Sequence, residues 1–282
     1  MTDSAIALDE QQREAIIEAL TTELSANFAI GLKSLRNYDE HRSEDLKWHL
    51  LAMAWRVALA SNDKVVRQRL VNYQLEIVVT GSAFLQGQAL KYLQDYLPSD
   101  FDQQAIGVLK ALPLTGDYAS EVIRLIGIAQ VRSTAPALRE IANTKWAAVK
   151  SDSFYANRTW AAWLVLARFG DRENTQRVIE QVRGEPNIVL RATRLFADLA
   201  YTRQSLAFDA LRLYLQSQNR LPQVKDTVPG DLESRYAAEL FAKYAIGCPI
   251  TAPDVYEKDI ATIRRWADAQ VSWKIRDSLS PA

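Results

Sequence analysis

This sequence is poor in the residues that catalysis and covalent crosslinking use most. One cysteine, Cys248, excludes an intrachain disulfide, and a lone cysteine is most often a small buried apolar residue. Two histidines, His41 and His49, leave almost no material for a Ser-His-Asp or Cys-His mechanism. With Asp45 between them they share one helical face, an arrangement that could hold a metal, but capping and surface hydrogen bonds explain them better. We therefore predict no metal site and no catalytic residue.

Several motifs and segments are also missing. The sequence has no phosphate-binding loop of the GxxxxGKS or GxGxxG type and no CxxC or HExxH motif, so we predict no cofactor and no enzymatic activity. Its paired carboxylates, such as Asp171 and Glu173, stand at predicted helix starts, where capping accounts for them. Residues 1–16 lack the pattern of a secretory leader, and no long apolar run occurs. We expect a cytoplasmic protein without membrane contact.

The residues that are plentiful favour helix. Ten glycines and nine prolines are few for 282 residues, whereas Ala, Leu, Gln, Arg and Glu are common. No series of alternating Val, Ile and Thr runs with hairpin turns appears. The predicted fold class is all-α, with one or two helices over 7–35 and further helices over 44–61, 64–80, 83–96, 101–111, 118–129, 133–142, 156–169, 173–183, 188–200, 204–217, 232–246 and 254–271.

A repeated pattern occupies the middle of the chain. Residues 161–182 read as an apolar helix, a break at Gly170-Asp171 and a more polar helix. The same pattern stands 41 residues earlier with Ala129 in place of Gly170, and 30 residues later with Ala200 in the break. Self-similarity at a period of about 30–45 residues is typical of a solenoid.

The two clearest copies resemble the short HEAT-like repeat of phycobilisome-lyase-type proteins and of many bacterial scaffolds. The matching residues are Ala161, Ala162, Leu166, Gly170, Asp171, Val178 and Ile179 in one copy, and Leu125, Gly127, Ala135, Pro136 and Leu138 in the other. The resemblance covers about residues 120–217 and implies a right-handed α-solenoid of stacked antiparallel helix pairs, with inner helices lining a concave binding face. It implies no particular activity, since such repeats serve many functions.

We predict one continuous domain over residues 1–282. Residues 1–80 fit the repeat poorly and are expected to be atypical N-terminal capping helices, residues 81–217 to be HEAT-like repeats, and residues 218–282 to be a C-terminal capping pair. The two longer connections, 143–155 and 217–231, are candidate contact surfaces, because long loops in compact folds are often functional.

Charge is balanced in total but unevenly distributed. Residues 1–129 hold 12 Lys and Arg against 17 Asp and Glu, residues 130–225 hold 15 against 8, and residues 226–282 hold 7 against 9. The repeat-bearing centre is therefore basic and the two flanks are acidic. Such asymmetry indicates an acidic partner or nucleic acid, and the alternative is a solvated, arginine-rich helix surface.

Arginine and aromatic side chains gather near the repeat turns, on the predicted second helices and in the two longer connections. These residue types dominate protein-binding hot spots. The candidate partner-binding residues are Arg132, Arg139, Trp146, Tyr155, Arg172, Arg177, Tyr201, Arg203, Arg212, Arg220 and Lys225. The alternative for each arginine is that its stem covers neighbouring apolar surface while the guanidinium stays in water.

Three functions fit these observations. We favour a non-enzymatic protein-binding module that presents a basic concave face to an acidic partner protein, as an adaptor, an assembly factor or a toxin-neutralising immunity protein. The alternative is a nucleic-acid-binding protein similar to the HEAT-like alkylpurine DNA glycosylases, against which the zero net charge and the acidic first third argue. A third possibility, implied by the resemblance, is a lyase or chaperone for a cofactor-bearing protein.

Overall fold

The computed structural model describes residues 64–144, 157–222, 230–250 and 255–277. Within these ranges the chain is helical, and the extended pairings are two isolated bridges, Arg220 with Leu232 and Ala245 with Ile275. The predicted all-α class is thus confirmed for this part of the chain, and no helix in it is long and apolar enough to cross a bilayer. The helices predicted over 7–35 and 44–61 lie outside the described ranges.

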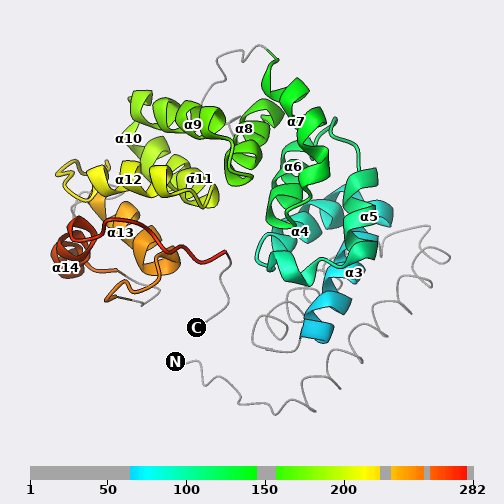
Figure 1. Ribbon diagram of the computed structural model, residues 1–282, viewed down its shortest axis with the longest axis horizontal. Coiled ribbons are helices and arrows are strands. Elements are labelled where there is room, and N and C mark those ends of the chain that lie inside the picture. Colours follow the sequence, from blue (N-terminus) through cyan, green and yellow to red (C-terminus); the bar gives the residue numbers. More distant parts are fainter. Residues whose placement is uncertain (1–63, 145–156, 223–229, 251–254, 278–282) are drawn as a thin grey trace, which may run out of the picture. The chain divides into compact units, whose positions relative to one another are not determined.

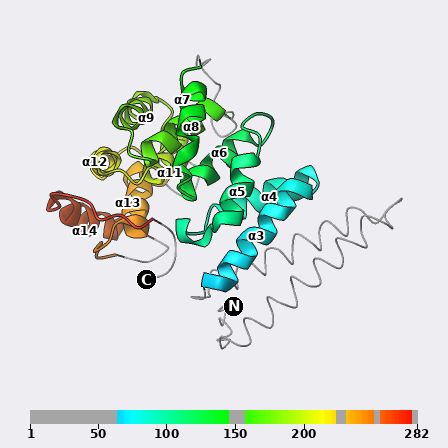
Figure 2. The ribbon, with the colours of Figure 1, turned by 45° about the vertical axis from the view of Figure 1, so that its right-hand side comes forward.

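The chain divides into two compact units between Leu112 and Pro113. The described part of the first unit contains helix α3 (Lys64–Thr80), helix α4 (Ala83–Leu93), the 3-10 turn η1 (Pro98–Asp100) and helix α5 (Gln103–Ala111). Helix α3 packs against α4 and α5, as Figure 2 shows. The single domain over residues 1–282 stays a prediction.

Carboxylates and hydroxyls start the helices of the first unit, as their positions in the sequence suggest. Ser82 caps α4 and Asp102 caps α5, where its Oδ1 accepts a hydrogen bond from the Ala105 amide at 2.8 Å. Asp100 has another role, because its buried carboxylate lies 2.7 Å from the guanidinium of Arg67 on α3. That ion pair ties η1 to α3.

The second unit is a series of helices that pair through short turns (Figure 1). In chain order the elements are α6 (Ala119–Ile128), η2 (Arg132–Thr134), α7 (Ala135–Ala142), α8 (Arg158–Arg168), α9 (Arg172–Gly184), α10 (Ile188–Leu190), η4 (Arg191–Leu195), α11 (Phe196–Tyr201), α12 (Ser205–Tyr214), α13 (Glu233–Tyr244) and α14 (Glu257–Asp268). The elements α10, η4 and α11 follow one another without a break, and η4 is a π-helical turn inside a helix predicted as regular.

Successive helix pairs of the second unit contact one another. The first helices of the pairs meet in the order α6, α8, α11 and α13, and the second helices α9, α12 and α14 meet in the same order. Within each pair, α7 packs on α8's side of the junction, α9 packs on α8, α12 on α11, and α14 on α13. Each pair therefore covers an apolar face that its neighbour leaves open.

Aromatic rings form much of the core of the second unit. Trp160, Phe196, Phe208 and Phe241 are fully buried. The rings of Phe208 and Phe241 meet edge to face with centroids 5.5 Å apart, and Trp273, which follows α14, lies 5.1 Å from Phe241. Ring pairs at such distances contribute about 0.5–1.5 kcal/mol beyond burial. The segment after α14 is therefore anchored in the core.

The turns inside three helix pairs share a left-handed residue. Gln130, Gly170 and Arg203 have φ angles of 54°, 97° and 57°. The sequence comparison aligned Ala129 and Ala200 with Gly170, and the backbone shows that this alignment is wrong by one and by three residues. The equivalent positions are 40 and 33 residues apart. Side-chain size misled the alignment, because the shared requirement is a positive φ and not a small side chain.

The first two of these turns close with the same hydrogen bond. After α6 the Val131 amide donates to the Ile126 carbonyl at 3.0 Å, and after α8 the Asp171 amide donates to the Leu166 carbonyl at 3.0 Å. This six-residue closure around a left-handed residue is the Schellman arrangement, which pairs the last carbonyls of a helix. The two helix ends are thus local structural equivalents.

Candidate partner-binding site

Three exposed arginines gather where two helix pairs meet. Arg132 lies in η2, Arg139 on α7 and Arg172 at the start of α9. Arg132 reaches the neighbouring pair, where its Nη1 donates to the Phe169 carbonyl at 2.6 Å and its guanidinium lies 5.4 Å above the Phe169 ring. Arg139 lies 3.9 Å from the carboxylate of Asp171, the residue before Arg172. We call Arg132, Arg139 and Arg172 the arginine cluster.

The arginine cluster carries more positive than negative charge. Among the described residues, Asp171 is the acid that an ion pair joins to the cluster, and its Oδ1 also caps α9 by accepting from the Asn174 amide at 3.1 Å. One carboxylate thus faces three guanidiniums and is itself shared with a helix end. A surface with such a surplus concentrates anionic groups from solution.

Arg177 and Arg212 lie on second helices, as predicted, and both cover rings. Arg177 on α9 donates to Glu173 at 2.5 Å, and its guanidinium lies 5.7 Å above the ring of Trp163. Arg212 on α12 lies 5.9 Å above the ring of Trp273 and is about one third exposed. For these two residues the structure shows stems that cover aromatic surface, which was the alternative expectation.

The remaining predicted residues of the two longer connections are only partly described. Arg220 is exposed and forms a two-nitrogen ion pair with Glu257 at 2.9 and 3.3 Å, which joins the connection before α13 to α14. Trp146, Tyr155 and Lys225 lie outside the residues that the structure describes. Their role in partner binding stays a prediction.

Tyr201 was expected at an exposed turn, but it lies between helix pairs. It ends α11, and its hydroxyl donates to the Arg124 carbonyl on α6 at 2.5 Å. Burial raises the pKa of Tyr201 to about 12, although the guanidiniums around the ring act in the opposite direction. A Cβ at position 127 would stand 2.2 Å from this hydroxyl, which explains why α6 carries Gly127 there. Tyr201 therefore joins two helix pairs through their interior.

A buried ion pair that the sequence analysis missed lies beside Tyr201. Arg124 on α6 donates through Nη1 to Oδ1 of Asp198 on α11 at 2.7 Å, and the indole of Trp160 on α8 donates to the second oxygen at 2.7 Å. All three side chains are buried. The signal was present, because an arginine inside the apolar run VIRLIGI must find an anion when that run is buried.

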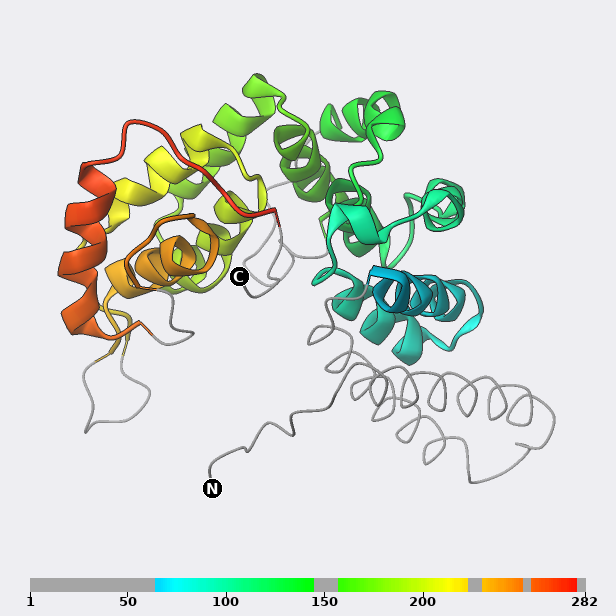
Figure 3. The ribbon, with the colours of Figure 1, turned by 60° about the horizontal axis from the view of Figure 1, so that its bottom comes forward.

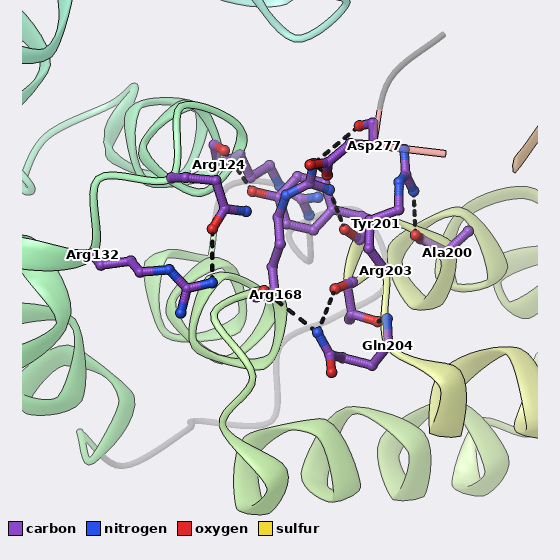
Figure 4. Close-up of polar contacts among 10 residues, drawn as sticks. Arg124, Arg132, Arg168, Ala200, Tyr201, Arg203, Gln204 and Asp277 are labelled. Atoms are coloured by element: carbon purple, nitrogen blue, oxygen red, sulfur yellow. Dashed lines mark hydrogen bonds and ion pairs between the residues drawn. The ribbon is translucent and has the colours of Figure 1, made fainter. Parts of the chain in front are cut away.

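A second buried arginine, Arg168 at the end of α8, was also missed. Its side chain is 1% exposed. Its Nη1 donates to the Tyr201 carbonyl at 2.6 Å, and its Nη2 donates to Oδ1 of Asp277 at 2.8 Å and to the Asp277 backbone carbonyl at 3.1 Å. Figure 4 shows Arg168 reaching both Tyr201 and Asp277, which come from opposite ends of the second unit's sequence.

Arg203 completes this group of arginines. Its backbone is left-handed, and its guanidinium lies 3.7 Å above the ring of Tyr244 and donates to the Ala200 carbonyl. Burial lowers the pKa of Arg203, with Tyr244 opposing that shift and the nearby Arg168 adding to it. A residue predicted at an exposed repeat turn is therefore half-buried beside a second cation.

The described residues offer little for metal or thiol chemistry. They contain no group of three or more His, Cys, Asp or Glu side chains that could hold a metal ion. His41, Asp45 and His49 lie outside them. Cys248 is buried, as expected for a structural cysteine, and burial raises the pKa of its thiol. The thiol is therefore held in its unreactive protonated form.

Comparison of the chain with family models, with curated proteins and with solved structures gives no match. The function is therefore argued from side-chain geometry and charge. Two features carry that argument: the arginine cluster on the surface, and the buried arginines around Tyr201.

Proposed function

We propose that this protein is a non-enzymatic binding module that holds a partner protein by that partner's acidic surface. The observation that carries the proposal is the arginine cluster, in which the exposed guanidiniums of Arg132, Arg139 and Arg172 share one carboxylate. Arginine suits this role, because its planar fork binds a carboxylate through two parallel hydrogen bonds. The 130–225 region as a whole has a surplus of basic residues, which extends the attraction beyond the cluster.

The proposed architecture is a right-handed, HEAT-like α-solenoid that presents its basic residues on a concave face. The ordered contacts of α6, α8, α11 and α13, and of α9, α12 and α14, support stacking of helix pairs. The recurrent left-handed residue at Gln130, Gly170 and Arg203 supports a structural repeat. Stacked pairs present side chains in rows along one extended surface, which is how such proteins bind other proteins. A cytoplasmic adaptor, assembly factor or immunity protein would use the surface in this way.

A nucleic-acid-binding protein, such as an alkylpurine DNA glycosylase of HEAT-like architecture, is the second candidate. Exposed arginines attract phosphates as well as carboxylates. However, exposed acids stand on α9 beside Arg172, among them Glu173 and Glu180. Those acids would repel a continuous phosphate backbone, whereas a protein surface with both charge signs accommodates them. We therefore favour a protein partner.

Affinity capture with a charge-reversed variant tests the proposed function. The double variant Arg139→Glu, Arg172→Glu is compared with the wild type in capture from host lysate, with and without nuclease, and bound proteins are identified by mass spectrometry. Both residues are exposed, and a glutamate at position 172 would stand in the first turn of α9, where the helix dipole favours it. We expect the wild type to retain one partner in both lysates and the variant to lose it.

The control is a double variant with the same change in net charge on the first unit, Arg69→Glu, Lys91→Glu, both exposed. It should retain the partner. Retention of the same partner by Arg139→Glu, Arg172→Glu would contradict the proposed site. Loss of every wild-type partner after nuclease treatment would favour the nucleic-acid alternative.

A further inference from the structure

The ion pair between Arg168 and Asp277 differs from the other buried ion pairs among the described residues. Both partners are buried in the pairs Arg67–Asp100, Arg124–Asp198 and Arg191–Glu233, with side chains no more than 11% exposed. Arg168 is 1% exposed, but Asp277 is 53% exposed. A buried cation thus takes its anion from the surface. That arrangement lets the anion be exchanged without opening the core.

The segment that supplies Asp277 is held by few bonds. The Ile246 amide donates to the Lys274 carbonyl at 2.8 Å, and the Arg276 amide donates to the Tyr244 carbonyl at 2.8 Å. Figure 3 shows this segment, in red, running back past α13 after α14. Trp273 stays anchored in the aromatic core at its start, so residues 274–277 can detach while the core stays intact. Short terminal segments of this kind open at low free-energy cost.

The place where Asp277 lies has unused binding capacity. Nε of Arg168 and Nε of Arg203 are buried and have no hydrogen-bond partner within the described residues. Of the two acids near Tyr201, Asp198 is engaged by Arg124 and Trp160, which leaves Asp277 as the anion for two cations. Unsatisfied buried donors are uncommon in folded proteins and often mark a functional site.

The aromatic rings and the backbone geometry also fit a binding site. The guanidinium of Arg168 lies 5.0 Å above the ring of Tyr201, and that of Arg203 lies 3.7 Å above the ring of Tyr244. Stacking on a ring holds a guanidinium in one orientation and leaves its edge free for a carboxylate. Arg203 keeps this place at a φ of 57°, a conformation that costs a residue with a side chain free energy and that clusters at functional sites.

We propose that Arg168 and Arg203, walled by Tyr201 and Tyr244, form a carboxylate-binding site, which Asp277 occupies in cis and an acidic side chain of the protein partner occupies in exchange. The cis occupant indicates the chemistry of the ligand. It is an aspartate in an extended segment, and Arg168 binds both its side chain and its backbone carbonyl. The ligand is therefore an extended, acidic stretch of the partner. This inference rests on the proposed function, that an acidic protein is the partner.

Binding of fluorescein-labelled hexaglutamate to the full chain, followed by fluorescence anisotropy, tests the site. Asp277→Ala removes the cis competitor, so the peptide should bind the variant about ten-fold more tightly than the wild type, the ratio expected if the closed form outnumbers the open form by about ten. Asp268→Ala, which removes an exposed acid from the end of α14, is the matched control and should bind like the wild type. Adding Arg203→Gly, which suits the positive φ, should abolish the gain.

Amide hydrogen exchange gives a second readout that needs no variant. Saturating hexaglutamate should speed exchange of the Ile246 and Arg276 amides in the wild type, because displacement of residues 274–277 breaks both of their bonds. Hexaglutamine should have no effect. Equal affinities of the wild type, Asp277→Ala and Asp268→Ala, or unchanged exchange at saturation, would overturn the inference.

The two proposals fail separately. If Arg139→Glu, Arg172→Glu loses the natural partner but Asp277→Ala gains no affinity for hexaglutamate, the carboxylate site is wrong and the proposed function stands. If Asp277→Ala gains affinity in an Arg203-dependent way while the double reversal has no effect, the arginine cluster is wrong and the carboxylate site stands.

Discussion

Glu233 is a fully buried acid whose charge is engaged on every side. Its Oε1 accepts from Arg191 at 2.6 Å, and its Oε2 accepts from Ser217 at 2.7 Å and from Asn219 at 3.1 Å. Burial alone would raise the pKa of Glu233, but these hydrogen bonds together hold it below its ordinary value of 4.5. The acid thus joins the π-turn η4, the connection after α12 and the start of α13.

Replacing this acid should destabilise the protein in a pH-dependent way. Glu233→Gln leaves Arg191 buried without its anion, and we expect a loss of about 3 kcal/mol in the free energy of unfolding at pH 7, measured with urea. Because the folded pKa is lowered, the contribution of the carboxylate is complete above pH 4.5 and disappears as the pH falls through the folded value. The difference between wild type and variant should therefore narrow in acid.

The exposed pair of Glu257 with Arg220 provides the control. Both partners are about half exposed, so Glu257→Gln should cost less than about 1 kcal/mol. A loss for Glu233→Gln that is equally small, or that stays constant from pH 7 to below pH 4.5, would contradict the assigned role.

Gly127 shows how one missing side chain sets the distance between helices. A Cβ there would stand 2.2 Å from the Tyr201 hydroxyl and 2.8 Å from a methyl of Val165. Gly127→Ala should therefore cost about 2 kcal/mol of unfolding free energy through overpacking, measured by urea denaturation.

Gly107→Ala on α5 is the matched substitution, since nothing lies within 4 Å of its added methyl. It should stabilise by about 0.5–1 kcal/mol, because alanine has the higher helix propensity. If both alanines had the same effect, close packing at Gly127 would not be the reason for glycine there.

At the scale of elements, the helix-ending turns show which local property the repeat preserves. Gly170 and Gln130 end equivalent helices at φ angles of 97° and 54°. Glycine adopts this region freely, whereas glutamine does so at a cost of about 1 kcal/mol. The turn geometry is kept at Gln130 because tertiary packing of the two flanking helices outweighs that cost.

Exchanging residue types between these turns should have effects of opposite sign. Gly170→Ala should destabilise by about 1 kcal/mol, since open space surrounds the position and only the backbone resists the change. Gln130→Gly should stabilise by up to about 1 kcal/mol, reduced by the greater freedom of glycine in the unfolded chain. Paired thermal and urea unfolding of both variants checks this, and destabilisation by Gln130→Gly would contradict it.

At the scale of the whole molecule, the distribution of charge predicts how partner binding responds to salt. The basic 130–225 region lies between acidic flanks and the net charge is zero, so long-range attraction is limited. Raising salt from about 50 to 200 mM should weaken binding of the captured partner by on the order of ten-fold. A loss of about a thousand-fold or more, as phosphate contacts produce, would point to nucleic acid. Titration of the purified partner by calorimetry at both salt concentrations provides the measurement.

Much of the helical architecture could be predicted from the sequence. The predicted helix over 64–80 coincides with α3, and the others from 83 onwards differ from the observed helices by a few residues at their ends. This works because apolar periodicity and breaks such as Gly170-Asp171 act between residues close in the chain. Exposure of Arg132, Arg139 and Arg172 was accessible for the same reason, since they stand at turns and on polar helix faces.

The interior polar contacts were decided by tertiary structure alone. Arg124 and Asp198 are 74 residues apart, and Arg168 and Asp277 are 109 residues apart. An arginine within an apolar helix indicates that an anion must be near, but local pattern contains no information on which acid the fold delivers. Likewise, the left-handed place of Arg203 follows from how α11 and α12 pack. The sequence by itself thus determined the helices and their exposed charges, and only the packing of distant helices decided which charges meet inside.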